Sequence, residues 1–259
     1  MDLGIARRHA VVCGSSRGLG RACAQALAEA DCVVVLNGRD AARLEAAAKE
    51  MAGATGAQVI PVAADVTTPE GRARLLGAVP QVDILVTNAD GPPPKPFRDI
   101  TTADVEKGVI SNMTTPIALI QGVIDGMVER RFGRIVNITS GSVKSPILGL
   151  DVSSGARAGL TAFLAGPARE VAQHNVTINN ILPGQFETDR LRIATARMAQ
   201  MRGLGVDEMM AQRRGAIPAK RFGDPREFGQ LCAFLASANA GYITGQNFLI
   251  DGGLFPGAF

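Results

Sequence analysis

The sequence contains few of the side chains on which metal, nucleophile and nucleic-acid chemistry depend. Its 259 residues include two histidines, four cysteines, one tyrosine and no tryptophan, and aromatic residues make up only 4%. His9 and His174 are far apart and no CxxC pair occurs, so we expect no zinc site and no mechanism that needs a histidine beside a nucleophile. So few aromatic rings also leave little surface for stacking on nucleic-acid bases.

An excess of one charge and long apolar runs are also missing. The net charge of +3 arises from 27 basic and 24 acidic residues spread along the chain, which favours neither nucleic acid nor a membrane surface as a partner. No apolar run approaches the roughly 18 residues of a membrane-spanning helix, and the first apolar stretch, Ala10–Cys13, is too short for a signal peptide. Three of the four cysteines fall in apolar runs, which indicates buried free thiols and predicts a cytoplasmic protein.

Short β-rich runs alternate with helical patterns along the whole chain. Most of the runs are continuously apolar, which is typical of strands covered by helices on both faces. The expected strands are Ala10–Cys13, Cys32–Leu36, Val59–Val62, Asp83–Thr87, Arg134–Thr139, Thr177–Leu182 and Phe248–Ile250. The expected helices are Arg21–Ala30, Ala41–Met51, Pro69–Val79, Ala103–Arg131, Ser154–Gln173 and Pro225–Ala236. This order predicts one α/β domain over residues 1–259, with a seven-stranded parallel sheet flanked by helices on both faces.

Two segments depart from the pattern. Gly166-Pro167 lies inside an expected helix and predicts a kink or a local break there. Residues 185–215 are rich in Arg and Met and follow Pro183-Gly184 at the end of a strand. Because ligands of open α/β sheets bind beyond the carboxyl ends of the strands, this segment is a candidate substrate lid; the alternative is an ordinary surface pair of helices. Apolar residues that would face such a pocket suggest a largely apolar substrate, unless they pack on their own domain: Leu148, Leu150, Phe186, Leu191 and Met198.

A glycine-rich segment joins the first strand to the first helix. It reads Cys13-Gly14-Ser15-Ser16-Arg17-Gly18-Leu19-Gly20. Glycines at these spacings allow a tight turn and let backbone N–H groups approach a pyrophosphate at a helix N-terminus. The same segment matches the G-x-S-x-G pattern of serine hydrolases, but His174 is the only later histidine and lies at a helix end, so a hydrolase is disfavoured.

With these motifs in this order, the chain resembles the short-chain dehydrogenase/reductase family nearly from end to end. Asp65-Val66 is similar to the family's adenine-binding pair, Asn88-Ala89-Asp90-Gly91 to its Asn-Asn-Ala-Gly turn, and Thr244-Gly245 with Asp251-Gly252-Gly253 to its C-terminal signature. The resemblance implies a single-domain, Rossmann-type doubly wound fold and a homotetramer or homodimer that packs its fourth and fifth helices. It also implies a set of cofactor-binding residues: Gly14, Ser16, Arg17, Gly18, Leu19, Gly20, Asn37, Arg39, Asp65, Val66, Asn88, Ala89, Asp90, Arg157, Pro183, Gly184 and Thr188.

The end of the second strand indicates the choice of cofactor. A carboxylate there would bond the ribose 2′-OH of NAD and repel a 2′-phosphate. This strand ends Leu36-Asn37-Gly38-Arg39, without an acid before Asp40. Arg17 and Arg39 can instead converge on a phosphate through charge-assisted bonds, so we expect NADP(H), the alternative being that both arginines are solvated.

The catalytic positions implied by the resemblance are only partly filled. Asn112 and Ser140 match the family's Asn and Ser, in the pattern of 3-oxoacyl-carrier-protein reductases. The positions of its Tyr-x-x-x-Lys hold Ser153 and Arg157, and the only tyrosine in the chain is Tyr242. A serine hydroxyl is a far weaker acid than tyrosine, and arginine stays charged and cannot relay a proton as lysine can. Arginine can still bond the nicotinamide ribose and stabilise an oxyanion.

Nearby groups offer other proton donors or substrate contacts, although each is equally read as an ordinary loop residue: Ser142, Lys144 and Asp151. Three functions stay open. The chain is an NADP(H)-dependent oxidoreductase reducing a small-molecule carbonyl, with Ser140 and Arg157 holding the oxygen and Asn112 supporting a proton-delivering water. Alternatively it is an NADP(H)-binding sensor or inactive partner subunit, or a non-redox lyase or isomerase on the same scaffold.

Overall fold

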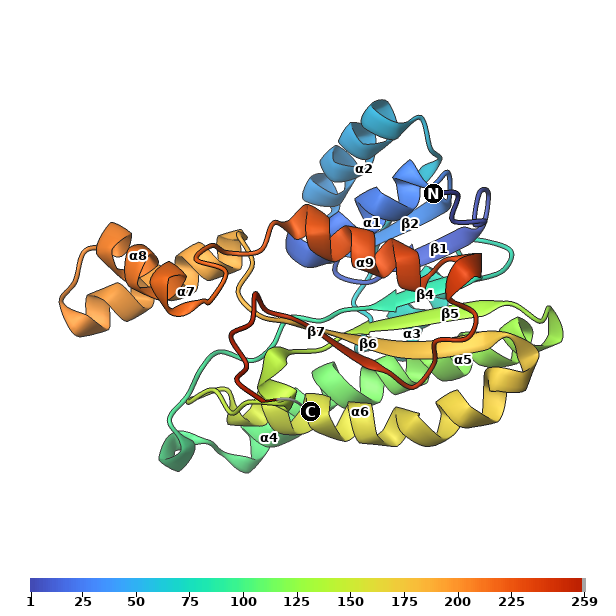
Figure 1. Ribbon diagram of the computed structural model, residues 1–259. Helices are drawn as coiled ribbons and strands as arrows, with labels where there is room; N and C mark the ends of the chain where they lie inside the picture. Colours follow the sequence, from blue (N-terminus) through green and yellow to red (C-terminus); the bar gives the residue numbers. More distant parts are fainter. Residues whose placement is uncertain (258–259) are drawn as a thin grey trace.

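One parallel sheet forms the centre of the molecule. The structure is a computed structural model that describes residues 1–257. The strands are β1 (His9–Val12), β2 (Val33–Gly38), β3 (Val59–Ala63), β4 (Ile84–Thr87), β5 (Gly133–Ile138), β6 (Val176–Pro183) and β7 (Asn247–Ile250). They pair in parallel in the order β3-β2-β1-β4-β5-β6-β7 (Figure 1). The order reverses between β1 and β4, which opens a crevice at their carboxyl ends.

Helices cover both faces of this sheet. The helices of the described residues are α1 (Gly18–Glu29), α2 (Ala41–Thr55), α3 (Pro69–Leu76), α4 (Thr102–Val109), α5 (Thr115–Glu129), α6 (Asp151–Val171), α7 (Asp189–Arg202), α8 (Val206–Ala216) and α9 (Pro225–Leu235), and all but α7 and α8 belong to the body of the domain. One apolar core joins the sheet to α1, α2 and α9, and the other joins it to α3, α5 and α6. The predicted α/β fold with a seven-stranded parallel sheet is therefore confirmed.

The long predicted helix 103–131 has an irregular centre. A π-helical turn, Ile110–Thr114, separates α4 from α5. The hydrophobic pattern of the sequence does not mark such a wider turn, so the turn was not predicted. The predicted break at Gly166-Pro167 is absent, since α6 runs through Pro167 without interruption. The carbonyl that loses its partner there belongs to Phe163, whose side chain is half exposed on the outer side of the helix.

Helices α7 and α8 form an arm that projects from the body (Figure 1). Arg213 of α8 braces the arm, because its Nε donates to Oε1 of Gln185 at 3.0 Å and its Nη1 to Oγ1 of Thr195 in α7 at 2.6 Å. Phe186, in the segment that leads from β6 to α7, is buried and packs edge-on against Phe228 of α9. The centres of the two rings are 5.3 Å apart. The arm coincides with the candidate lid.

The four cysteines have the buried positions expected from the sequence. Cys13, Cys23, Cys32 and Cys232 are all buried and free. Among the described residues, no helix has the length and apolarity needed to span a bilayer.

Candidate functional site

The glycine-rich loop after β1 forms the tightest turn at the sheet reversal. Gly14 and Gly18 adopt the left-handed conformation, with φ of 56° and 61°. A side chain at Gly20 would overlap the carbonyl of Gly14, whereas Gly18 faces open space. Asn88, after β4, donates from Nδ2 to the Gly14 carbonyl at 3.1 Å and so ties the two loops of the crevice together. The first turn of α1 has no side-chain cap, which leaves its backbone N–H groups free for an anion.

Two polar residues beneath the loop hold its shape. Ser15 donates to the Val12 carbonyl at 2.7 Å and accepts from the Asn37 backbone at 2.9 Å. The buried amide of Asn37 donates to the carbonyls of Val62 and Ala64 at 3.2 and 3.0 Å. The side chain of Asn37 is therefore engaged within the chain and supports the loop from below. Ser16 and Leu19 are half-buried beside it.

Charged side chains surround the outer end of the crevice. Nη2 of Arg39 lies 3.8 Å from Oδ2 of Asp90, and both side chains are largely exposed. The carboxylate of Asp65 accepts from the backbone and hydroxyl of Thr67 at 3.0 and 2.7 Å, which with the charge of Arg39 holds its pKa below the usual value. Arg17 is exposed on the other side of the loop. Since exposed ion pairs are weak, Arg39 can exchange Asp90 for a phosphate.

Ser140 follows β5 at the same edge of the sheet. Its Oγ accepts from the backbone N–H of Ser142 at 3.1 Å and from the Ser142 hydroxyl at 2.9 Å. With those donors in place, the hydrogen of the Ser140 hydroxyl is free to donate outward. The structure thus gives Ser142 a defined position behind Ser140.

Ser153 and Arg157 lie one turn apart on α6 and are bonded to each other. Nε of Arg157 donates to Oγ of Ser153 at 3.1 Å. Its remaining nitrogens donate to backbone carbonyls that follow β4 or end β5: Ile138 at 2.7 Å, Thr139 at 3.1 Å and Ala89 at 3.0 Å. Arg157 is only 7% exposed, and burial together with the nearby charge of Arg190 lowers its pKa to about 10. Arg157 stays charged at neutral pH and fixes the position of the Ser153 oxygen through its hydrogen bond.

Asn112 lies in the π-helical turn that packs against α6. It is 1% exposed, and its Nδ2 donates to the Gly108 carbonyl at 3.3 Å and to the Ser111 hydroxyl at 2.7 Å. Its Oδ1 is buried and has no donor among the described residues. An uncompensated buried acceptor is costly, and π-turns occur frequently at functional sites, so this oxygen points to a ligand or water position.

The loop after β6 closes the site. Gly184 donates its N–H to the Ile250 carbonyl at 2.9 Å, and a side chain there would press on Asp251. Thr188 caps α7 by accepting from the backbone of Leu191 at 3.4 Å. A side chain at Gly141 would lie 3.2 Å from the Pro183 carbonyl, so the loops after β5 and β6 are adjacent.

Several other residues singled out in the sequence lie apart from this group. Tyr242 is fully exposed, and Lys144 is exposed with its Nζ 5.8 Å above the ring of Phe255. Asp151 is exposed as the first residue of α6. Leu191, expected to face a pocket, is buried in a small core with Ile217 and Phe222 instead, whereas Phe186 is buried in the main core and also lines a pocket of about 200 Å³.

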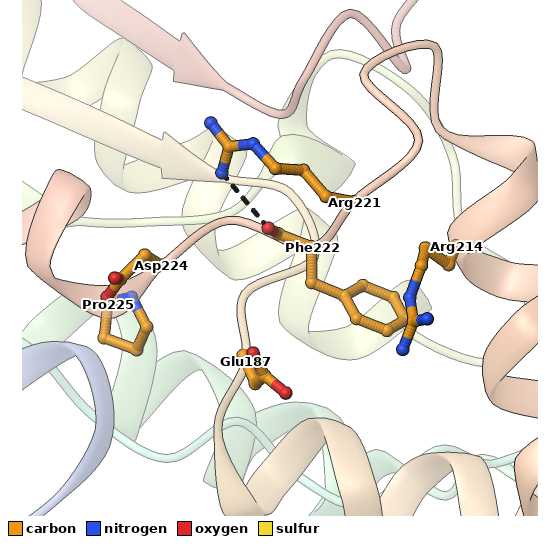
Figure 2. A pocket seen from close by; sticks show the side chains of 6 residues that line it. All are labelled: Glu187, Arg214, Arg221, Phe222, Asp224 and Pro225. Atoms are coloured by element: carbon orange, nitrogen blue, oxygen red, sulfur yellow. Dashed lines mark hydrogen bonds between the residues drawn. The ribbon is translucent and has the colours of Figure 1, made fainter.

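A cavity of about 590 Å³ lies where the arm meets the body (Figure 2). It is lined by Glu187, Arg214, Arg221, Phe222, Asp224 and Pro225. Figure 2 shows the guanidinium of Arg221 bonded to the Phe222 carbonyl, at 3.3 Å. None of the predicted catalytic residues lines this cavity.

The sequence analysis missed one residue at the site. Arg190, at the start of α7, lies beside Ser153: a methyl group added at Gly91 would be 3.0 Å from Nη2 of Arg190 and 3.1 Å from Oγ of Ser153. The available signal was a basic side chain two positions after Thr188.

The comparisons with known proteins agree over nearly the whole chain. Residues 14–255 match the family model described as Enoyl-(Acyl carrier protein) reductase. A 3-oxoacyl-[acyl-carrier-protein] reductase of Aquifex aeolicus is 32% identical over 98% of this chain and 100% of its own. An acetoacetyl-CoA reductase of Cupriavidus necator is 37% identical over 69% of this chain and 68% of its own. The solved structure of L-sorbose reductase from Gluconobacter frateurii, complexed with NADPH and L-sorbose, has a TM-score of 0.93 at 28% identity and covers 99% of this chain and 100% of its own.

Proposed function

Because the chain belongs to the short-chain dehydrogenase/reductase family, in its 3-oxoacyl-reductase-like branch, we propose that it reduces a carbonyl group to an alcohol with NADPH. One observation carries this proposal. The hydroxyls of Ser140 and Ser153 lie at the carboxyl edge of the sheet. Their oxygens accept hydrogen bonds from Ser142 and Arg157, respectively, so each hydroxyl keeps its own hydrogen to donate to a substrate oxygen.

NADP(H) is the cofactor, and the residues present fit it. The turn from Gly14 to Gly20, the free first turn of α1 and the open space at Gly18 suit a pyrophosphate. The exposed guanidiniums of Arg17 and Arg39 suit a 2′-phosphate. Asp65, Val66 and the turn Asn88–Asp90 would hold the adenine and ribose, and Pro183, Gly184 and Thr188 the nicotinamide side. NADPH supplies the hydride when bound.

Ser153 and Arg157 stand where the family has tyrosine and lysine. Nε–H of Arg157 donates to one of the two acceptor positions of the Ser153 oxygen, so the Ser153 hydroxyl keeps its hydrogen and one acceptor position for a substrate. The Ser140 oxygen accepts two bonds, from the backbone and the hydroxyl of Ser142, so the Ser140 hydroxyl keeps only its hydrogen to donate. The two hydroxyls and the fixed positive charge of Arg157 together stabilise a developing oxyanion.

The proton comes from water in this scheme. Serine is too weak an acid to release its proton at neutral pH, and arginine cannot relay one. The buried Oδ1 of Asn112 supplies an acceptor that holds such a water in the π-turn beside α6. Losing a positioned general acid typically lowers the rate about 10²–10⁴-fold, so we expect slow turnover.

The experiment that tests the proposal follows the hydride. NADPH deuterated on its transferred face is incubated with the protein and a panel of ketones, oxo acids and 3-oxoacyl thioesters, and the products are analysed by mass. Deuterium on the carbinol carbon is the expected result. Tight NADPH binding without label in any product would favour the alternative of a sensor or inactive partner subunit, and product formed without net loss of NADPH would favour a lyase or isomerase.

Two neighbouring serines provide a matched pair for the same assay. Ser153→Ala removes the hydroxyl bonded to Arg157, and we expect its rate to fall. Ser154→Ala removes a buried hydroxyl that has no hydrogen-bond partner in the described part of the chain, and we expect its rate to stay unchanged. Equal rates for the two variants would remove Ser153 from the mechanism.

We also propose that the protein is a homotetramer or homodimer whose copies meet through α5 and α6. Phe163 is half exposed on α6, and the space around Gly155 is open, so a second helix can approach closely. Phe163→Glu should then shift the mass measured by light scattering to that of a monomer.

The arm of α7 and α8 acts as a lid in this proposal. The free thiols fit a reducing compartment such as the cytoplasm.

A further inference from the structure

We propose that Arg190 binds a carboxylate of the substrate, so that the compound reduced is a free oxo acid. This inference rests on the proposed function and adds a substrate class to it. The arginine comes from the arm, whereas the groups that hold the reacting oxygen come from the body of the domain.

The position of Arg190 is fixed by its distances to the site. Nη2 of Arg190 and Oγ of Ser153 approach the same small space above Gly91, at 3.0 and 3.1 Å from the point where a methyl group would stand. Gly91 itself has no positive φ, so the close approach of these side chains, rather than backbone conformation, accounts for its lack of a side chain. The guanidinium therefore lies close enough to the Ser153 hydroxyl for one small substrate to contact both side chains.

Arg190 carries a charge for which residues 1–257 supply no counter-ion. No carboxylate of the described residues forms an ion pair with it, while its neighbour Arg192 lies 3.8 Å from Glu187. Asp90, the carboxylate closest in sequence to Gly91, lies 3.8 Å from Arg39 and forms no ion pair with Arg190. Arg190 is exposed to solvent.

Arg157 cannot take the anion in its place. Four of its five N–H groups donate to Ser153 and to the carbonyls of Ile138, Thr139 and Ala89, so it has no pair of N–H groups left for a carboxylate. The result is two like charges close together, one buried and engaged, the other free. A carboxylate beside the reacting carbonyl would relieve this repulsion and accept the paired bonds that a guanidinium offers.

The carboxylate site is tested by measuring substrate binding to the complex with NADP⁺, which cannot reduce the substrate. The protein is saturated with NADP⁺, and acetoacetate or its neutral methyl ester is titrated in by calorimetry. We expect the wild type to bind the acid at least about tenfold more tightly than the ester, as a charge-assisted bond provides. Arg190→Gln should bring the two affinities together, while Arg192→Gln, two positions along the same helix, should keep the difference.

Three results would overturn the inference. They are no saturable binding of acetoacetate by the wild type, an acid preference that survives in Arg190→Gln, and a loss of NADP⁺ affinity in Arg190→Gln, which would assign this arginine to the cofactor. The deuterium assay separates this failure from that of the proposed function. Label in neutral ketones without an acid preference refutes only the carboxylate site, and an acid preference without label in any product refutes only the reductase.

Discussion

The Nε of Arg157 donates a hydrogen bond to the Oγ of Ser153, one turn earlier on α6, at 3.1 Å. The same guanidinium holds the carbonyls of Ala89, Ile138 and Thr139, which end or follow neighbouring strands. One buried cation thus positions a candidate catalytic hydroxyl and also ties together the segments that follow β4 and β5. Catalysis and stability are therefore coupled at this residue.

Replacement of Arg157 by methionine should destabilise the protein as well as inactivate it. The variant keeps the volume of the stem but leaves buried acceptors without donors, which costs about 2–4 kcal/mol in free energy of unfolding. Urea denaturation measures this loss. Arg169→Met on the exposed side of the same helix is the control, and its stability should change by no more than about 0.5 kcal/mol. Equal effects of the two substitutions would contradict the structural role of Arg157.

The phosphate loop predicts different outcomes for two neighbouring glycines. Gly20→Ala drives a methyl group into the Gly14 carbonyl, so it should cost about 1–3 kcal/mol and abolish NADPH binding. Gly18→Ala meets no atom of the chain, so its loss of stability comes only from the strain of its positive φ, about 1 kcal/mol. Urea denaturation compares the two losses of stability, and fluorescence titration measures NADPH binding by Gly20→Ala.

A third glycine serves as the control for the loop. Gly53→Ala in the exposed part of α2 should leave NADPH binding intact and raise stability by about 0.5–1 kcal/mol. If Gly20→Ala bound NADPH as the wild type does, the tight packing of this turn would be refuted.

The choice of phosphorylated cofactor should depend on Arg39. Arg39→Asp places a carboxylate where the 2′-phosphate is expected and should lower the ratio of NADPH to NADH affinity by about 10–100-fold. Arg43→Gln, which removes a nearby exposed charge in α2, should leave the ratio unchanged. An unchanged ratio in Arg39→Asp would rule out this arginine as the phosphate ligand.

Buried thiols predict a loss of stability in alkali. Burial raises the pKa of Cys13 from 9.0 to about 12. Between these values the unfolded chain loses the thiol proton while the folded chain keeps it, so the folded state binds more protons and stability falls as pH rises. The contribution is complete below pH 9 and falls by about 1.4 kcal/mol per pH unit above it.

The variant Cys13→Ser tests this cause, since a serine does not titrate in the range. The slope of unfolding free energy against pH, measured by urea denaturation from pH 9 to 11, should be shallower than in the wild type. A slope equal to that of the wild type would show that other groups govern alkaline unfolding.

The sequence predicted the sheet well because its strands are buried on both faces. The continuously apolar run Cys32–Leu36 corresponds to β2 at Val33–Gly38, with ends moved by one or two residues. The π-turn at Ile110–Thr114 could not be predicted in this way, because one extra residue in a helix leaves its apolar stripe nearly unchanged.

The site was predicted as positions but not as contacts. The sequence spacing placed Ser153 and Arg157 one helical turn apart, and in the structure the two side chains are hydrogen-bonded to each other. The carbonyl partners of Arg157, the pairing of Arg39 with Asp90 and the approach of Arg190 all depend on loops from different strands. Such contacts follow from tertiary structure and have no local signature in the sequence.

Helix α9 also determines when the cofactor site can form. It packs on α1 so closely that a side chain at Gly229 would overlap the carbonyl of Ala22, and Phe228 and Cys232 share a core with Cys23. Helix α1, which follows the phosphate loop, is thus covered by residues that lie more than two hundred positions later in the sequence. A nascent chain on the ribosome will hold the apolar face of α1 uncovered until α9 has emerged, so the nucleotide site can be assembled only after α9 has been synthesised.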